Sequence, residues 1–221
     1  MLLASALAMG CCAVAPAQPR ACQGAPVRIE HASEAEAELA CDGARAAFGF
    51  LALPDLNLPE PLWLELSDQL PKAVSQGAAG YFERHTHRIV VLHYEKFAQQ
   101  QTWLGLPIEA EVYRSIFAHE VAHAIATSHA GEHRLSPAAQ EYAAHVTMLA
   151  TASPALRERI LAQRPGNGFD REHQINELIY ALDPQWFAVE SYRHWLRQPD
   201  PAAFLRRVLD GAAIPGLESG S

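Results

Sequence analysis

The pattern of hydrophobic and polar residues divides the chain into a first part with short strands and a second part that is helical. Four short segments rich in apolar and β-branched residues predict strands: 26–31, 62–66, 80–84 and 88–92. The last two flank the polar turn His85-Thr86-His87, which predicts a β-hairpin with both histidines exposed.

Helical periodicity and helix-start residues predict the other elements. Ser33 before Glu34 and Glu36 predicts a helix that runs to about residue 50, and Ser136-Pro137 predicts the start of another. Further helices are predicted at residues 107–126, with Pro107 at the start, and at 155–163, 171–181, 185–196 and 202–209. Strands followed by helices indicate an α+β fold with a small, mostly antiparallel sheet.

The predicted helix 107–126 contains a candidate metal site. His119 and His123 are four residues apart, so both side chains lie on one helix face, a spacing at which two imidazoles bind one zinc ion. Glu120 follows the first histidine directly, which suits a base that acts on metal-bound water. The flanking residues are apolar and predict a buried helix, in which two histidines and a glutamate need partners. A metal-free buried helix with hydrogen-bonded histidines is the alternative.

Two residues compete to be the third zinc ligand. Glu141 is the carboxylate in an otherwise apolar run of the next helix, and we place it in the first turn, where the chain has room to return to the metal. His129 stands six residues after His123, the spacing of a second type of zinc site that needs a sharp break after the second histidine. Ala126 occupies the place of that break and favours continuation of the helix, so Glu141 is the preferred ligand.

Composition and charge limit the function classes. The chain has 221 residues, of which 49% are apolar, enough for one domain with a hydrophobic core. A net charge of −8 without a basic tract argues against nucleic-acid binding. The apolar N-terminal run is too short to predict a stable membrane span. Oligomeric state is not indicated.

The N-terminus has the pattern of an export signal. Residues 1–15 are apolar or small and uncharged, and Ala15-Pro16-Ala17 matches a small-x-small cleavage site. We therefore predict a signal peptide at residues 1–17 and a periplasmic or secreted location. Cys11, after Ala8-Met9-Gly10, offers the weaker alternative of a lipoprotein.

The cysteines predict one disulfide bond. Cleavage of the signal removes Cys11 and Cys12 and leaves Cys22 and Cys41, an even pair in an exported chain. A bond between them would attach the leading segment to the first helix. Two free buried thiols are the alternative.

The motif region resembles a known enzyme family. The sequence Phe-Ala-His-Glu-Val-Ala-His-Ala-Ile at 117–125, followed by Gln-Glu-Tyr-Ala-Ala at 140–144, resembles the gluzincin branch of the zincin metallopeptidases. The hairpin at 80–92 resembles the edge-strand region of that fold, and the resemblance covers roughly residues 44–150. The helical C-terminal part is more similar to exported bacterial proteins than to peptidases.

The resemblance implies a ligand set and a domain organisation. It implies zinc on His119, His123 and Glu141, with Glu120 as general base. Many gluzincins have an acidic residue four positions after the glutamate ligand, where this chain has His145. The expected organisation is a zincin-like catalytic domain at 18–153, a helical extension packed on it at 154–215, and a flexible tail at 216–221.

The implied function is zinc-dependent hydrolysis of peptide bonds in a peptide or protein substrate. Glu120 would deprotonate zinc-bound water, and the hairpin strand nearest the metal would hold an extended peptide. His145, Tyr192 and His194 are candidates for an oxyanion donor or for a residue that supports the ligands, and Tyr180 and His173 are further candidates. The alternative is a non-catalytic zinc-binding scaffold or interaction protein.

Overall fold

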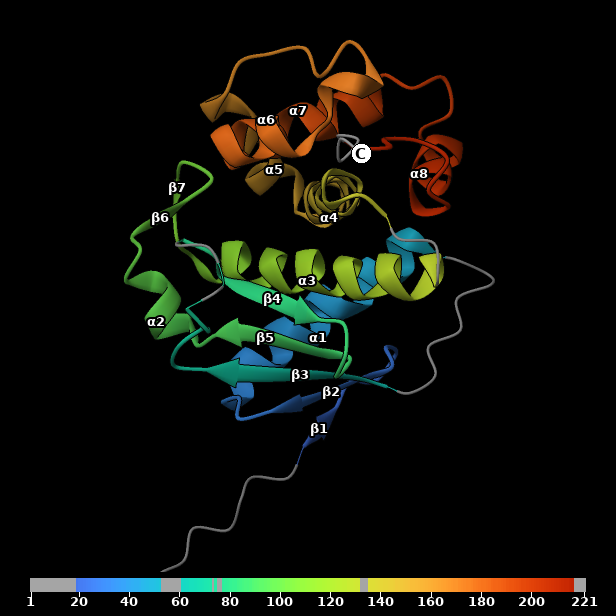
Figure 1. Cartoon of the computed structure of the whole chain (residues 1–221). Helices are drawn as coiled ribbons and strands as arrows, with labels where there is room; N and C mark the ends of the chain where they lie inside the picture. Colours follow the sequence, from blue (N-terminus) through green and yellow to red (C-terminus); the bar gives the residue numbers. More distant parts are fainter. Residues whose placement is uncertain (1–18, 53–60, 73, 75–76, 132–134, 217–221) are drawn as a thin grey trace, which may run out of the picture.

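The computed structural model has an α+β architecture with a five-stranded sheet on one side and helices on the other (Figure 1). The structure describes residues 19–52, 61–72, 74, 77–131 and 135–216. The strands of the sheet are β1 (Arg20–Ala21), β2 (Val27–Glu30), β3 (Leu62–Ser67), β4 (Gly80–Glu83) and β5 (Arg88–Leu92), in the order β1-β2-β3-β5-β4. The strand predictions and the hairpin are confirmed, and a short β1 is added at one edge. Of the two turn histidines that were predicted to be exposed, His85 is exposed and His87 is half-buried beside Phe82.

The sheet is mixed, so the prediction of a mostly antiparallel sheet is wrong. β2 pairs with β3, and β3 with β5, in parallel, whereas β1–β2 and β4–β5 are antiparallel. The first parallel pair arises because helix α1 (Glu34–Leu51) follows β2 and returns the chain to the same end of the sheet before β3. After β3 the chain forms β4 at the edge and turns back, so that β5 lies between β3 and β4.

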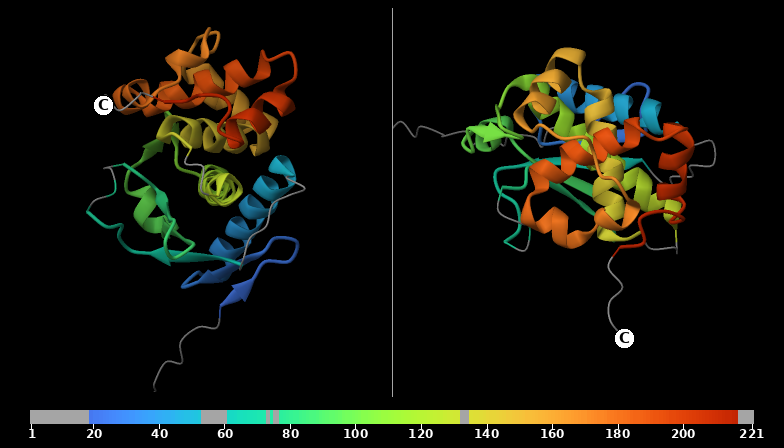
Figure 2. Two further views of the ribbon diagram at one scale, coloured as in Figure 1. Left: turned by 45° about the vertical axis from the view of Figure 1, so that its right-hand side comes forward. Right: turned by 90° about the horizontal axis from the view of Figure 1, so that it is seen from above.

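The helices of the described chain form layers over one face of the sheet. They are α2 (Tyr94–Ala98), α3 (Ala110–Ala130), α4 (Pro137–Thr151), α5 (Pro154–Gln163), α6 (Glu177–Leu182), α7 (Pro184–Leu196) and α8 (Pro201–Leu209), together with α1. Helices α1 and α3 lie against the sheet, and α4 crosses α3 on the far side (Figure 1). In the left view of Figure 2, α3 is seen end-on between α1, the sheet and α4.

Helix α3 is buried because apolar side chains surround it on several faces. Ile116, Phe117, Val121 and Ile125 are all at most 1% exposed, and α3 contacts α1, α4, β4 and β5. A helix that is hydrophobic around its circumference belongs in the interior. The motif histidines therefore lie at the centre of the molecule.

Both predicted ends of the helix at 107–126 are corrected. Pro107 lies in a strand, because β6 (Thr102–Trp103) and β7 (Leu106–Pro107) form a small hairpin, and α3 begins three residues later, after Glu109. Helix α3 also continues past residue 126 to Gly131, whose φ of 58° ends it. Helix α4 begins at Pro137 as predicted, and Glu141 is its fifth residue, so Glu141 lies just beyond the first turn rather than in it.

The predicted helix at 171–181 is two elements. A 3₁₀-helix at Glu172–Gln174 precedes α6, whose first turn is capped by the side chain of Asn176. The extended backbone of Asn176 (φ −145°) breaks the helical path between them. The other C-terminal helices agree with the predicted ranges to within one residue.

The predicted disulfide is confirmed. Cys22, after β1, is bonded to Cys41 of α1, which attaches the edge of the sheet to the first helix. Disulfides persist in oxidising compartments, so this bond is compatible with export. None of the described helices is both long enough and apolar enough to span a membrane. The signal peptide at 1–17, Cys11 and residues 217–221 of the tail lie outside the described residues.

Candidate metal centre

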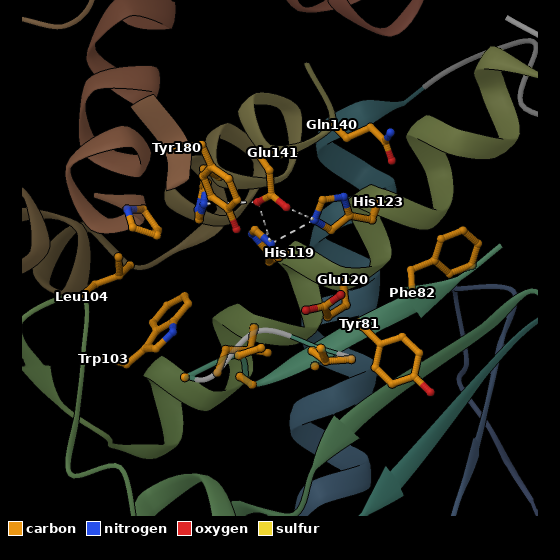
Figure 3. A pocket seen from close by; sticks show the side chains of 18 of the residues that line it. Tyr81, Phe82, Trp103, Leu104, His119, Glu120, His123, Gln140, Glu141 and Tyr180 are labelled. Atoms are coloured by element: carbon orange, nitrogen blue, oxygen red, sulfur yellow. Dashed lines mark hydrogen bonds and ion pairs between the residues drawn. The ribbon is translucent and has the colours of Figure 1, made fainter. Parts of the chain in front are cut away.

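Helix α3 presents the motif residues to a cleft. His119 and His123 lie one turn apart on the same face of the helix, and their Nε2 atoms are 3.1 Å from each other. Glu120 points into the same cleft and is only 6% exposed (Figure 3). Burial of the surrounding apolar residues fixes the helix, and the four-residue spacing brings the two imidazoles together.

Helix α4 contributes the third residue of the group. Ser136 caps α4, its Oγ accepting from the backbone N–H of Ala139 at 3.0 Å, and Pro137 occupies the first helical position. This start sets the rotation of α4, which faces Glu141 towards α3. The carboxylate atoms Oε2 and Oε1 are 3.7 Å from His119 Nε2 and 3.6 Å from His123 Nε2.

His119, His123 and Glu141 form a group that can hold a metal ion, and we call these three residues the metal group, or the ligand group. One ligand atom from each of His119, His123 and Glu141 lies within 4.8 Å of the others. Two buried atoms of the group, His119 Nδ1 and Glu141 Oε2, have no hydrogen-bond partner within the described part of the chain. A buried carboxylate oxygen without a partner is costly, and a cation bound between the three side chains would compensate it.

Burial determines the protonation of the surrounding groups. It lowers the pKa of His119 well below its usual value, with smaller contributions from His145 and His123. Burial also lowers the pKa of His145 to about 3, assisted by His123. Both imidazoles are therefore neutral at physiological pH, the state in which a nitrogen lone pair can bind a metal.

Glu120 is set apart from the ligand group. It is not among the three clustered ligand residues. Burial, and secondarily the Glu141 carboxylate, raises the pKa of Glu120 well above that of an exposed glutamate. Glu120 is thus a carboxylate of increased basicity beside the metal group.

The cleft has a volume of about 410 Å³ and is formed by elements from both halves of the chain. Edge strand β4 contributes one wall, with Gly80, Tyr81 and Phe82, and the β6–β7 hairpin contributes Trp103 and Leu104 (Figure 3). Tyr180 of α6 lies beside Glu141 on the opposite wall. Its pKa is raised by burial, and further by Glu141 and Glu120, so its hydroxyl remains protonated.

The structure does not bring Tyr192 and His194 to this cleft. His194 Nδ1 lies 2.8 Å from the Tyr142 hydroxyl, behind α4, and Tyr192 packs on the Trp195 ring at 5.6 Å between centroids. His129 lies in the last turn of α3, with its Nε2 2.8 Å from Asp210 Oδ1. His173 is exposed in the 3₁₀-helix. The extension of α3 past Ala126 thus carries His129 away from the metal group.

Several residues of the cleft are not predicted by any pattern in the sequence. Trp103, Leu104 and Gln140 line it, and Gly80 adjoins Glu120. Tyr180 was named only among several aromatic candidates. Leu104 and Gly105 both have positive φ, at 49° and 75°, and form the tight turn of the β6–β7 hairpin. The glycine after Trp103-Leu104 was the one local sign of that turn.

A family of unknown function, DUF6639, matches residues 27–218, which is most of the chain. The chain belongs to the DUF6639 family. The matched region includes strands β2 to β5 and all the described helices, and it leaves out only β1 and the residues around it. No curated protein and no solved structure matches the chain.

Proposed function

We propose that this DUF6639 protein is a zinc-dependent peptidase of the gluzincin type. The observation that carries the proposal is the convergence of His119 and His123 from α3 and Glu141 from α4 at one cleft, with Glu120 beside them. Two imidazoles and one carboxylate are the protein ligands of many catalytic zinc sites. Ligand atoms around a tetrahedral zinc ion lie about 3.3 Å apart, given bonds of ~2.0 Å. The 3.1 Å between the two Nε2 atoms and the 3.6 Å between His123 Nε2 and Glu141 Oε1 are close to this value, and Oε2 of the same carboxylate lies 3.7 Å from His119 Nε2.

In the proposed hydrolysis, each residue around the metal group has its own role. When bound, zinc would lower the pKa of a water ligand and polarise a substrate carbonyl. His119, His123 and Glu141 would hold the ion. Glu120 would accept the proton of the attacking water and return it to the leaving amine, a role for which its raised pKa is suited. Tyr180, protonated and beside the ligand group, is the side chain we assign as donor to the substrate oxygen.

Strand β4 provides a backbone surface for an extended peptide. The N–H of Leu92 donates to the carbonyl of Ala79, so the antiparallel alternation directs the backbone groups of Tyr81 and Glu83 towards β5. The backbone groups of Gly80 and Phe82 are then left on the open edge, and both residues line the cleft. A peptide that added to this edge would pass the metal group.

The proposal is tested with Glu120→Gln and the matched control Glu95→Gln. Glu120 lines the cleft, whereas Glu95 is exposed on α2, away from it. We expect both variants to bind one zinc per chain. Glu120→Gln should lower cleavage of a peptide library, followed by mass spectrometry, by about 10²- to 10⁴-fold, and Glu95→Gln should cleave as the parent does. Absence of zinc binding in the parent would refute the proposal. Zinc binding without cleavage by any variant would favour the non-catalytic zinc protein.

A further inference from the structure

His145 is a buried histidine that the ligand group and the proposed mechanism leave without a role. Its side chain is 6% exposed, and neither Nδ1 nor Nε2 has a hydrogen-bond partner among the described residues. Enclosed histidines outside the cleft have partners, since His194 pairs with Tyr142 and His129 with Asp210. An unpaired buried polar group costs stability. We therefore expect His145 to have a hydrogen-bond partner once the site is occupied.

The surroundings of His145 fix its ring and direct one nitrogen to Glu141. The imidazole lies between the rings of His119, Tyr180 and Phe187, with centroids 4.6, 6.2 and 6.3 Å away. Its Nε2 is 3.5 Å from Glu141 Oε2, one turn earlier on α4. That oxygen is also buried without a hydrogen bond. A possible donor and an acceptor, both unpaired, therefore face each other at slightly more than hydrogen-bond distance.

The orientation of Glu141 depends on what its second oxygen contacts. Oε1 is the carboxylate atom near His123, at 3.6 Å, whereas Oε2 lies 3.5 Å from His145 Nε2 and 3.7 Å from His119 Nε2. A carboxylate that ligates through one oxygen leaves the other available for a hydrogen bond, and such supporting contacts orient ligands in metal sites. We propose that His145 is a positioning residue of the metal centre, whose Nε2–H donates to Glu141 Oε2 and holds Oε1 towards the ion.

This inference rests on the metal site of the proposed function and adds a feature to it. The gluzincin resemblance implies an acidic residue at position 145, which would bring a second negative charge next to the ligands. An imidazole in that place supports the glutamate without adding charge. Glu141 is then the one anionic residue of the ligand group. Because fewer negative charges lie next to the ion, more of its positive charge is available to polarise a substrate.

The test compares His145→Phe, His145→Gln and the control His194→Phe in the full chain. Phenylalanine keeps the ring packing but removes the donor, glutamine keeps an N–H donor, and His194 is a buried histidine outside the cleft. Each protein is stripped of metal and titrated with Zn²⁺ against a chromophoric chelator. The visible spectrum of the Co²⁺-loaded protein reports the ligand set.

We expect His145→Phe to weaken zinc binding by about 10- to 100-fold, with the Co²⁺ spectrum of the parent retained. His145→Gln should recover most of the affinity, and His194→Phe should bind as the parent does. Parent-like affinity in His145→Phe would overturn the inference and leave the proposed function intact. A changed Co²⁺ spectrum would also overturn it, because His145 would then be a ligand itself. A parent protein that binds neither metal would refute both proposals.

Discussion

At the scale of single residues, Gly80 determines whether Glu120 fits beside the edge strand. A Cβ at Gly80 would lie 2.8 Å from the carbonyl oxygen of Val90 and 3.2 Å from Glu120 Cγ. Contacts with a backbone atom at that distance force a shift. The absence of a side chain at position 80 therefore allows β4 and the proposed base to approach each other.

We predict that Gly80→Ala lowers peptide cleavage by about 10- to 100-fold, because a small displacement of a reacting group is costly. The zinc dissociation constant should stay as in the parent, since Glu120 is not one of the ligands. Cleavage rates and zinc titrations of the same preparations check this. Gly49→Ala is the control, because a Cβ at that exposed site in α1 meets nothing within 4 Å. Parent-like cleavage by Gly80→Ala would contradict the prediction.

Two of the three ligands predicted from the sequence lie in one local helical pattern. His119 and His123 are joined by one turn of α3, so their meeting follows from periodicity alone. Glu141 required only that the next helix return. Tyr180 and Trp103 reach the cleft through tertiary packing of α6 and the β6–β7 hairpin. No local spacing distinguishes Tyr180 from Tyr192, which packs elsewhere.

At the scale of elements, the placement of α4 determines where Glu141, the third candidate ligand, lies. Ser136 caps it and also donates through Oγ to the carbonyl of Ile214. Ser153 caps the next helix, α5, in the same way, its Oγ accepting from Leu156 N. The two serines are thus matched caps, and one of them lies on the element that carries Glu141.

We predict that Ser136→Ala and Ser153→Ala each lower the free energy of unfolding by about 1 kcal/mol, the typical value of an N-cap. Only Ser136→Ala should also weaken zinc binding, by several-fold, because the start of α4 orients Glu141. Urea unfolding of metal-free protein and zinc titration measure the two effects separately. Equal zinc affinity in the two variants would show that the cap does not position the ligand.

Caps and turns made most elements predictable, whereas strand pairing was not. The β4–β5 hairpin follows from its polar turn, and α1 from the capping box of Ser33 and Glu36. Parallel pairing of β2 with β3 depends on how α1 crosses the sheet. No local sequence pattern predicts this crossing. Pro107 fits both a helix start and an edge strand, and the β6–β7 hairpin decides between them.

At the scale of the whole molecule, the metal group joins the two layers of the fold. His119 and His123 belong to the helix against the sheet, and Glu141 belongs to the helix on which α7 and α8 pack. An ion bound by all three would connect these layers. Any ligand that binds only the folded state stabilises it.

We predict that zinc at about 100 times its dissociation constant raises the free energy of unfolding by about 2.7 kcal/mol. A chelator should remove this gain, and Glu141→Gln should reduce it because it weakens binding. Glu158→Gln, on α5 outside the ligand group, is the control and should keep the full gain. Denaturant unfolding with and without zinc provides the measurement. An unfolding midpoint that does not respond to zinc would contradict the prediction.

The Cys22–Cys41 bond also has a consequence for the order in which the protein matures. Both cysteines precede β3 and are separated by 19 positions. A polypeptide is synthesised from its amino end, so both sulfurs exist before any residue of α3 or α4 has been added. The ends of a loop of this length meet quickly, and the oxidation that joins them is the slower step. Formation of the bond needs no residue of α3 or α4, so folding of the proposed metal site can begin from a chain whose first edge is already covalently fixed.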